Sequence, residues 1–320
     1  IWSHDGQHNY ESLTSRLANA LHGFTSSNNR FSDENEKGDE YEVSGNFEHR
    51  YRKEGMKLNV LYSLNYSTGR VRTGITTHGL DMSGAHLGDP FLQQSNNDEQ
   101  EHINTLRVDQ AMPLGPHATL EFGYKGMFRS LYSDFRNLYA QGGIYINDPR
   151  SSNIFRYNDR IHAAYGLIRG HVGEKADPKW RYEAGLRFEQ MDYAGTSNGG
   201  SSFSKTYFNA FPNAMLAYTT GKDAFVKLNY GKRINRPGLG ELNPFLDITD
   251  SLNPHSGNPD LVPEIVHALE LGYTQDRSRF QFTANLFYRR GIHTIMNYVF
   301  LDSVGHALSK PVNIDRKSVV

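Results

Sequence analysis

The stretch MKLNVLYSLNY, from Met56 to Tyr66, alternates between apolar and polar side chains, with Leu61 as the one exception. The apolar positions are Leu58, Val60, Tyr62, Leu64 and Tyr66, and the positions between them include Lys57, Asn59, Ser63 and Asn65. Successive side chains of a β-strand point to opposite faces, so this period of two predicts a strand with one apolar and one polar face.

The same alternation returns along the chain, for example in Leu120 to Phe128, Trp180 to Phe188 and Phe280 to Tyr288. Globular strands usually have about 5–6 residues, whereas about 9–11 tilted residues cross a bilayer. The runs therefore predict membrane-crossing strands over 41–51, 56–66, 102–112, 118–130, 158–172, 180–192, 207–218, 224–234, 265–274 and 279–290, with weaker strands near 12–23 and 292–301.

The predicted connections alternate in length. Short ones lie at 52–55, 113–117, 173–179, 219–223 and 275–278, and long ones at 67–101, 131–157, 193–206 and 235–264. Membrane barrels sort their connections in this way, with short periplasmic turns and longer extracellular loops. A soluble sandwich exposes both ends to water and has no reason to do so. The pattern predicts an all-β, antiparallel transmembrane β-barrel.

The composition fits a barrel and excludes other classes. The 320 residues are 12% aromatic, contain no cysteine and carry a net charge of -1, and the mean hydropathy is -0.64. No stretch approaches the roughly 18 apolar residues of a membrane helix. The absence of cysteine excludes disulfides and thiolate zinc sites, and the balanced charge gives no bias towards nucleic acid. Tyrosines near the strand ends suit an interfacial girdle.

The sequence offers no catalytic, metal or cofactor motif. The acidic run SDENEKGDE, from Ser32 to Glu40, begins like a calcium loop, but Lys37 and Ser44 stand where the template needs oxygen ligands. The 14 histidines include no His-Glu-x-x-His pair, and nothing places a nucleophile beside His162 or His267. We therefore interpret 32–40 as a solvated external loop and the protein as a non-enzyme without cofactors or metal.

Charged residues of both signs occupy the polar positions of the predicted strands. An Arg or Lys facing lipid near the bilayer midplane costs about 2–4 kcal/mol, so these residues are expected to face the barrel interior. Such a ladder can bind a polar substrate, dock a folded plug or pair with itself across strands. Examples are Glu42, Glu48 and Arg50, and then Arg181, Glu183, Arg187 and Glu189.

One segment, RINRPGLGELNPFLDITDSLNPHSGNPDLVPE from Arg233 to Glu264, carries three short elements in order: R-I-x-R-P, N-P-F and G-N-P-x-L-x-P-E. It resembles the corresponding region of TonB-dependent receptors, a family of outer-membrane β-barrels, and the resemblance covers roughly Glu40 to Ile314. The matching residues are Arg233, Ile234, Arg236 and Pro237; Asn243, Pro244 and Phe245; and Gly257, Asn258, Pro259, Leu261, Pro263 and Glu264.

Prolines shape this segment. Five of them lack the N–H that a central strand needs, so the segment is expected to be a stiff loop folded over the extracellular mouth. A structural cap and a ligand gate are both compatible with such a loop. The prolines are Pro237, Pro244, Pro254, Pro259 and Pro263.

The resemblance implies a receptor in the Gram-negative outer membrane that imports a scarce solute with energy from the inner membrane. Its partners would be outer-membrane lipid, a plug domain with further barrel strands, and the TonB protein; nucleic acid is not among them. The alternative is a non-energised barrel, either a passive pore or a surface adhesin, and a soluble β enzyme is a third hypothesis. Iron chelates, vitamins, glycans and peptides all pass through this architecture, so no ligand-binding residue is assigned.

The plug and the energy-coupling box of the family are not visible in the chain, and family barrels have 22 strands, so we expect a fragment of about 10 to 12 strands. We assign 1–40 to a loop with a possible partial strand and 41–314 to the barrel segment. Residues 315–320, DRKSVV, read as a non-native tail translated from a sequencing adapter.

Strands with the curvature of such a barrel trace about half its circumference, which predicts an open trough with two unpaired edges. The convex face should carry Leu58, Val60, Tyr62, Leu64, Phe122, Tyr124, Leu186, Leu228, Phe282 and Leu286, and the concave face Lys57, Asn59, Glu183, Arg187 and Lys227.

Overall fold

The computed structural model describes residues 2–18, 24–174, 177–198, 201–248, 254–301 and 307–314. They form an all-β structure dominated by a 12-stranded antiparallel sheet. Its strands, in sheet order, are β1 (Trp2–Ala18), β2 (Phe24–Arg50), β3 (Lys57–Leu80), β4 (His86–Pro113), β5 (Ala118–Gln141), β7 (Asn153–Glu174), β8 (Asp177–Ser197), β9 (Ser202–Gly221), β10 (Ala224–Asn235), β13 (Glu264–Arg277) and β14 (Phe280–Ile292), and β6 (Ile144–Asn147) pairs with β5.

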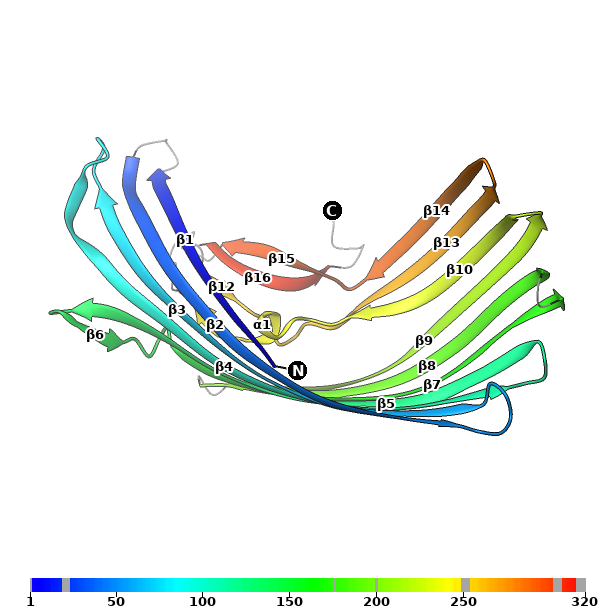
Figure 1. Cartoon of the computed structure of the whole chain (residues 1–320). Helices are drawn as coiled ribbons and strands as arrows, with labels where there is room; N and C mark the ends of the chain where they lie inside the picture. Colours follow the sequence, from blue (N-terminus) through cyan, green and yellow to red (C-terminus); the bar gives the residue numbers. More distant parts are fainter. Residues whose placement is uncertain are drawn as a thin grey trace.

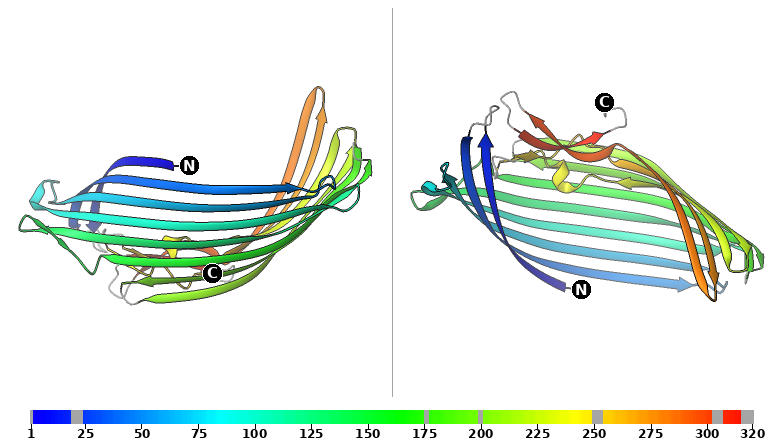
Figure 2. Two further views of the ribbon diagram at one scale, coloured as in Figure 1. Left: turned by 60° about the horizontal axis from the view of Figure 1, so that its bottom comes forward. Right: turned by 90° about the horizontal axis from the view of Figure 1, so that it is seen from above.

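The sheet is an open, strongly curved trough (Figures 1 and 2). β1 and β14 are its edges, and within the described residues each pairs with one neighbour only. The predicted all-β antiparallel barrel segment with two open edges is therefore confirmed.

The strand register separates two faces. Directly paired residues of antiparallel strands share a face, and a row of such residues across the sheet is called a rung here. One rung contains Val60, Val108, Tyr124, Ala164 and Phe188. The adjacent rung, which has the opposite facing, contains Asn59, Asp109, Gly123, Tyr165 and Arg187. Towards the β14 edge of the sheet, Leu228, Leu271 and Leu286 continue the same apolar face. The predicted convex and concave sets therefore lie on opposite faces.

The charged set faces the concave side. Leu242 of the short helix α1 (Leu239–Leu242) clusters with Tyr157 and Ile161, which share the facing of the Asn59 rung. Figure 1 shows α1 within the trough. "Inward" below means this concave face and "outward" the convex one.

The outward apolar residues form a layer of limited height across the sheet, and we call this layer the band. On β3 it runs from Leu58 to Tyr66, and the next outward residues are Thr68, Arg70 and Arg72. A tilted strand of this length rises about 20 Å, close to the roughly 25 Å apolar belt of membrane barrels. Aromatic rings mark its upper limit: those of Tyr41 and Tyr66 lie 6.3 Å apart and those of Tyr66 and His102 lie 4.5 Å apart. No helix among the described residues is long and apolar enough to cross a membrane.

The strands continue far beyond the band, and this part of them is called the extension. β3 pairs with β4 well past Tyr66, so the long connection predicted at 67–101 is wrong, and those at 131–157 and 193–206 are largely strand as well. Above the membrane the outward face of the sheet meets water, and so does the inward face where the segment 236–263 does not cover it. Side chains then need not alternate in polarity, although the backbone ladder is unchanged.

The N-terminal prediction is corrected in the same way. Residues 1–40 were expected to form a loop with a partial strand, but β1 and most of β2 lie there and pair residue by residue. The acidic run from Ser32 to Glu40 is the middle of β2 and not a loop. Four of the five predicted short turns, at 52–55, 113–117, 219–223 and 275–278, lie between consecutive strands of the structure, and the fifth, at 173–179, falls partly outside the described residues. Gly55 and Gly115 adopt a φ of +77° in two of these turns, which glycine tolerates best. The proposed tail, 315–320, lies outside the described residues.

A second, four-stranded sheet lies inside the trough (Figure 1). It contains β11 (Leu246–Asp247), β12 (His255–Ser256), β16 (Ala307–Ile314) and β15 (Thr294–Leu301) in that order. The weak strand predicted near 292–301 is thus β15, which belongs to this inner sheet and not to the barrel wall.

Candidate functional site

The Pro-rich segment 236–263, here called the motif loop, packs on a small hydrophobic core on the inward face. Leu261 is fully buried at 0% exposure. The core consists of Phe155, Tyr157 and Ile161 of β7, Met191 and Tyr193 of β8, and Leu242 and Leu261 of the motif loop. Burial raises the pKa of the Tyr193 hydroxyl, which therefore remains a neutral hydrogen-bonding group beside Tyr207.

A buried carboxylate fastens the start of the motif loop. Glu189 of β8 is 4% exposed and forms ion pairs with both Arg236 of the loop and Arg187 of its own strand. The Nε atoms of both arginines have no hydrogen-bond partner in the described part of the chain. Burial of a carboxylate costs free energy unless the charge is paired, so removal of either arginine should destabilise the site.

A second ion pair lies next to the first. Asp159 of β7 has a fully buried side chain and accepts a hydrogen bond of 3.0 Å from Nε of Arg129 on β5. Arg129 also lies 3.8 Å from Glu101 of β4 and 5.5 Å from the ring centre of Tyr157. Burial raises the pKa of Glu101, and the positive charge of Arg129 opposes that shift.

The N-P-F element is organised by Asn243, which follows α1. Its Oδ1 accepts hydrogen bonds from the backbone N–H of Phe245 at 3.2 Å and from the amide of Asn153 on β7 at 3.3 Å. Its backbone carbonyl accepts from Gly257 N–H at 2.9 Å. The Phe245 ring lies 6.1 Å from that of Phe135 on β5. This asparagine therefore joins two motif elements to the barrel wall.

The glycine of the third element is explained by close backbone approach. A Cβ at Gly257 would collide with the carbonyl oxygens of Asn243 and Gly240. The neighbouring Ser256 hydroxyl donates to the carbonyl of Pro244 at 3.1 Å. Elements that are far apart in the motif thus form a single folded unit.

The inner sheet closes over this unit. Asn258 donates to the carbonyl of Pro311 at 3.0 Å, and the side chain of Asn313 binds both the N–H and the carbonyl of Val262 at 2.9 Å. At the end of the loop, the Glu264 carboxylate accepts from Thr294 at 3.1 Å. Hydrogen bonds therefore join both β15 and β16 to the motif loop or its end.

The other motif residues take less part. Arg233 lies within β10 opposite Val266 with an exposed side chain. Pro263 is buried, whereas Pro237 and Pro259 are partly buried and have no N–H to donate. The role of the loop as a cap or as a ligand gate stays a prediction.

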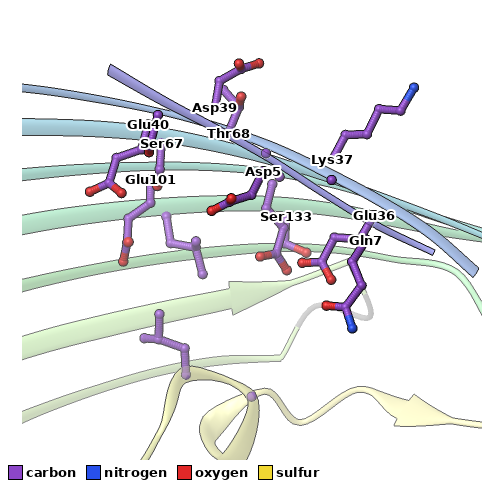
Figure 3. Close-up of a pocket in the computed structure, with 18 of the residues that line it drawn as sticks. Asp5, Gln7, Glu36, Lys37, Asp39, Glu40, Ser67, Thr68, Glu101 and Ser133 are labelled. Carbon is purple, nitrogen blue, oxygen red and sulfur yellow. The ribbon is translucent and has the colours of Figure 1, made fainter. Parts of the chain in front are cut away.

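The sequence reading missed an acidic recess of about 850 Å³ between β1–β5 and the motif loop (Figure 3). Between Glu34 and Glu42 of β2, the inward positions carry no Lys or Arg, and Lys37 has the opposite facing. The sequence does contain a signal for this recess, because acidic residues at every second position of a strand lie on one face of it. The carboxylates that line the recess include Asp5, Glu36, Glu40, Glu99 and Glu101.

The recess can attract cations, but it is not a preformed metal centre. In the residues that the structure describes, no three His, Asp or Glu side chains converge closely enough to hold a metal ion. Nearer the turns, the inward charges pair with one another: Arg50 with Glu48 at 2.6 Å, and Arg107 with Asp109 at 2.7 Å. This self-pairing is one of the three roles that the sequence left open for the charged ladder.

Comparisons with known proteins agree with this geometry. A family model described as "Outer membrane protein beta-barrel family" matches residues 49–320. No curated protein sequence matches the chain. Among solved structures, the copper transporter OprC superimposes with a TM-score of 0.54 at 12% identity, over 97% of this chain and 52% of that one.

Two further structures resemble the chain less closely. The siderophore receptor PirA from Pseudomonas aeruginosa gives a TM-score of 0.48 at 15% identity, over 97% of this chain and 57% of that one. The ferric citrate transporter FecA gives 0.47 at 13%, over 90% and 44%. The chain thus spans about half the length of these proteins. At such identities the likeness concerns the fold, and the family match carries the assignment: this chain belongs to the outer membrane protein beta-barrel family and lies in the outer membrane of a Gram-negative bacterium.

Proposed function

We propose that the chain forms part of a TonB-dependent receptor that imports a scarce solute across the outer membrane. The observation that carries the proposal is the motif loop. The three elements on which the resemblance rests fold into one unit, and Arg236 and Glu189 fasten that unit to the inward face. The names of the similar structures, a copper transporter and a siderophore receptor, support transport over catalysis.

The strand number that the family resemblance implies, about 22, fits an energised mechanism. A barrel of about 22 strands has a lumen that needs a plug, because an unplugged barrel of 16–18 strands is already an aqueous channel. The inward polar wall would hold such a plug, and the TonB protein would supply the energy to shift it. A solute would first enter the space enclosed by the extension of the strands. The acidic recess gives that space a negative electrostatic potential.

The test has two parts. We expect the complete reading frame to encode a plug domain and a coupling box upstream of this segment. We also expect a strain that lacks the gene to lose growth on one class of scarce solute from a panel of iron chelates, vitamins and glycans, and loss of the TonB protein to have the same effect.

Two outcomes would contradict the proposal. A full-length frame without a plug or coupling box would favour the non-energised barrel. Uptake that persists at the normal rate without TonB would do the same, because a passive pore needs no energy source.

A further inference from the structure

Two histidines meet at the end of the sheet that carries the short turns. His117 ends the turn between β4 and β5, and His171 lies near the end of β7. Nδ1 of His117 is 3.2 Å from Nε2 of His171, and the backbone N–H of His171 donates to the carbonyl of His117 at 3.0 Å. The short turns of outer-membrane barrels face the periplasm, so the pair lies at the periplasmic rim.

Both histidines line a recess of about 650 Å³, here called the turn recess. His171 has the inward facing of Tyr165 on the same strand and pairs directly with Arg181 of β8. The charged residues of the lining balance one another, because they are two arginines and two carboxylates: Arg169, Arg181, Glu54 and Glu183. The turn recess therefore carries no excess of positive charge that would repel a cation.

The surroundings of this pair differ from those of other histidines. His4 lies 3.0 Å from a carboxylate oxygen of Asp39, and His8 lies 2.6 Å from one of Asp33. His117 and His171 instead turn ring nitrogens towards each other. Two ring nitrogens that face each other need at least one neutral ring, and neutral imidazole is the form that binds metal ions.

The distance between the two nitrogens fits two ligands of one metal ion. Zn²⁺ binds histidine nitrogen at about 2.0–2.1 Å, so two nitrogens on one tetrahedral ion lie about 3.3–3.4 Å apart. The same bond lengths at a right angle place them about 2.8–3.0 Å apart. The observed 3.2 Å lies between these values.

The orientation of the rings agrees with a shared ion. The ring centres are 5.0 Å apart, which is less than the 3.2 Å between the nitrogens plus the distance from each nitrogen to its own ring centre. The two ring axes therefore meet at an angle. A straight N–H···N hydrogen bond would instead place both rings along one line.

We infer that His117 and His171 together bind one divalent transition-metal ion, such as Zn²⁺, at the periplasmic rim. Imidazole nitrogen suits Zn²⁺, Cu²⁺ and Ni²⁺, whereas Mg²⁺ and Ca²⁺ take oxygen ligands. No third His, Asp or Glu of the described residues converges with the pair, so water or an outside ligand completes the coordination. The bound ion fastens the turn between β4 and β5 to β7.

The inference is independent of the proposed import. The acidic recess lies in the extension, at the other end of the strands, and is lined by carboxylates and not by histidines. The two recesses should therefore differ in the cations that they prefer.

The experiment uses the complete protein, purified from outer membranes in detergent, and titrates Zn²⁺ and Mg²⁺ separately by calorimetry. We expect His117→Gln and His171→Gln each to weaken Zn²⁺ binding by about tenfold or more, since even the loss of an outer-shell partner can cost that much. Glutamine keeps a hydrogen-bonding side chain but lacks the imidazole nitrogen, so the variants separate metal binding from a direct hydrogen bond.

Hydrogen exchange of 114–118 gives a second readout. Zn²⁺ should slow this exchange in the unsubstituted protein but not in either variant, because an ion that binds only the folded turn stabilises it.

The matched control is His49→Gln. His49 lies near the same end of the sheet, opposite Leu58, and its ring packs against that of Tyr51 with centres 4.6 Å apart. The substitution removes one exposed imidazole and should leave the Zn²⁺ affinity unchanged.

Three results would overturn the inference. The first is a Zn²⁺ affinity that is the same in the unsubstituted protein and in both variants. The second is an equal loss of affinity in His49→Gln, which would show that the ion binds exposed histidines without selection. The third is Mg²⁺ that binds as tightly as Zn²⁺ and is lost in the same variants, which would assign the binding to carboxylates.

Discussion

The band and the extension are made from the same strands, yet they are built in opposite ways. In the band, apolar side chains such as Val60 and Leu228 face outward and charged ones face inward. In the extension the core faces inward, where Tyr157 and Tyr193 pack with Leu261 of the motif loop.

The difference shows that the surroundings, and not the backbone ladder, decide the side-chain pattern. Hydrocarbon solvates apolar side chains, so the band needs no core of its own. Water does not solvate them, so the extension must bury its apolar side chains as a soluble protein does. Four predictions test this contrast.

The largest effect is expected in the inward core. Leu261→Ala removes a fully buried side chain and should destabilise the docked motif loop by about 4 kcal/mol. Hydrogen exchange of 254–263 in the complete protein measures this. Leu246→Ala, at a side chain that is 45% exposed, is the control and should change exchange little. Equal effects of the two substitutions would mean that the loop is not docked on this core.

A charge on the outward face tests the band itself. Val60→Arg should cost about 3 kcal/mol of folding free energy in lipid vesicles, because the guanidinium would face hydrocarbon. Thr68→Arg lies on the same strand and the same face, but in the extension, and should cost less than about 1 kcal/mol. Urea titration of refolded protein measures both, and similar costs would show that the band boundary is misplaced.

The ion-pair anchor should contribute less. Glu189→Gln leaves Arg236 and Arg187 with a neutral partner and should loosen the motif loop by about 2 kcal/mol. The control is Glu121→Gln, which breaks an exposed pair with Arg169 and should cost less than about 1 kcal/mol. Protease sensitivity of the loop is the measurement. An unchanged cleavage rate in Glu189→Gln would rule out an anchoring role.

The smallest effect is a pH dependence at the tip of the extension. The Asp81 carboxylate accepts hydrogen bonds from the Ser83 hydroxyl at 2.6 Å and from the N–H of Ala85 at 2.9 Å, and the hydroxyl bond is the main cause of its lowered pKa. A lowered folded-state pKa means that the stabilisation is complete above the unfolded-state value and is lost as pH falls through the folded-state value.

The turn between β3 and β4 should therefore loosen below about pH 4, the range of an ordinary Asp pKa and lower. Hydrogen exchange of 81–85, corrected for the intrinsic pH effect, measures it. Asp81→Asn should abolish the pH dependence, and a pH dependence that survives this substitution would point to another group.

The sequence by itself determined the band. Alternation in stretches such as 56–66 gave the strands, their facing and the short turns, because only one face of those strands meets hydrocarbon and the difference is written in every second residue. The three motif elements likewise marked the loop that the structure fastens to the wall.

Only the tertiary structure decided the rest. Three features depend on partners that are distant in the chain. They are the pairing of Ser32–Glu40 of β2 with β3, the ion pair between Arg236 and Glu189, and the placement of β15 in an inner sheet. Where both faces of a strand meet water, its sequence need not alternate in polarity, so alternation no longer predicts the strand. The backbone pairing there continues the register of the same strands in the band.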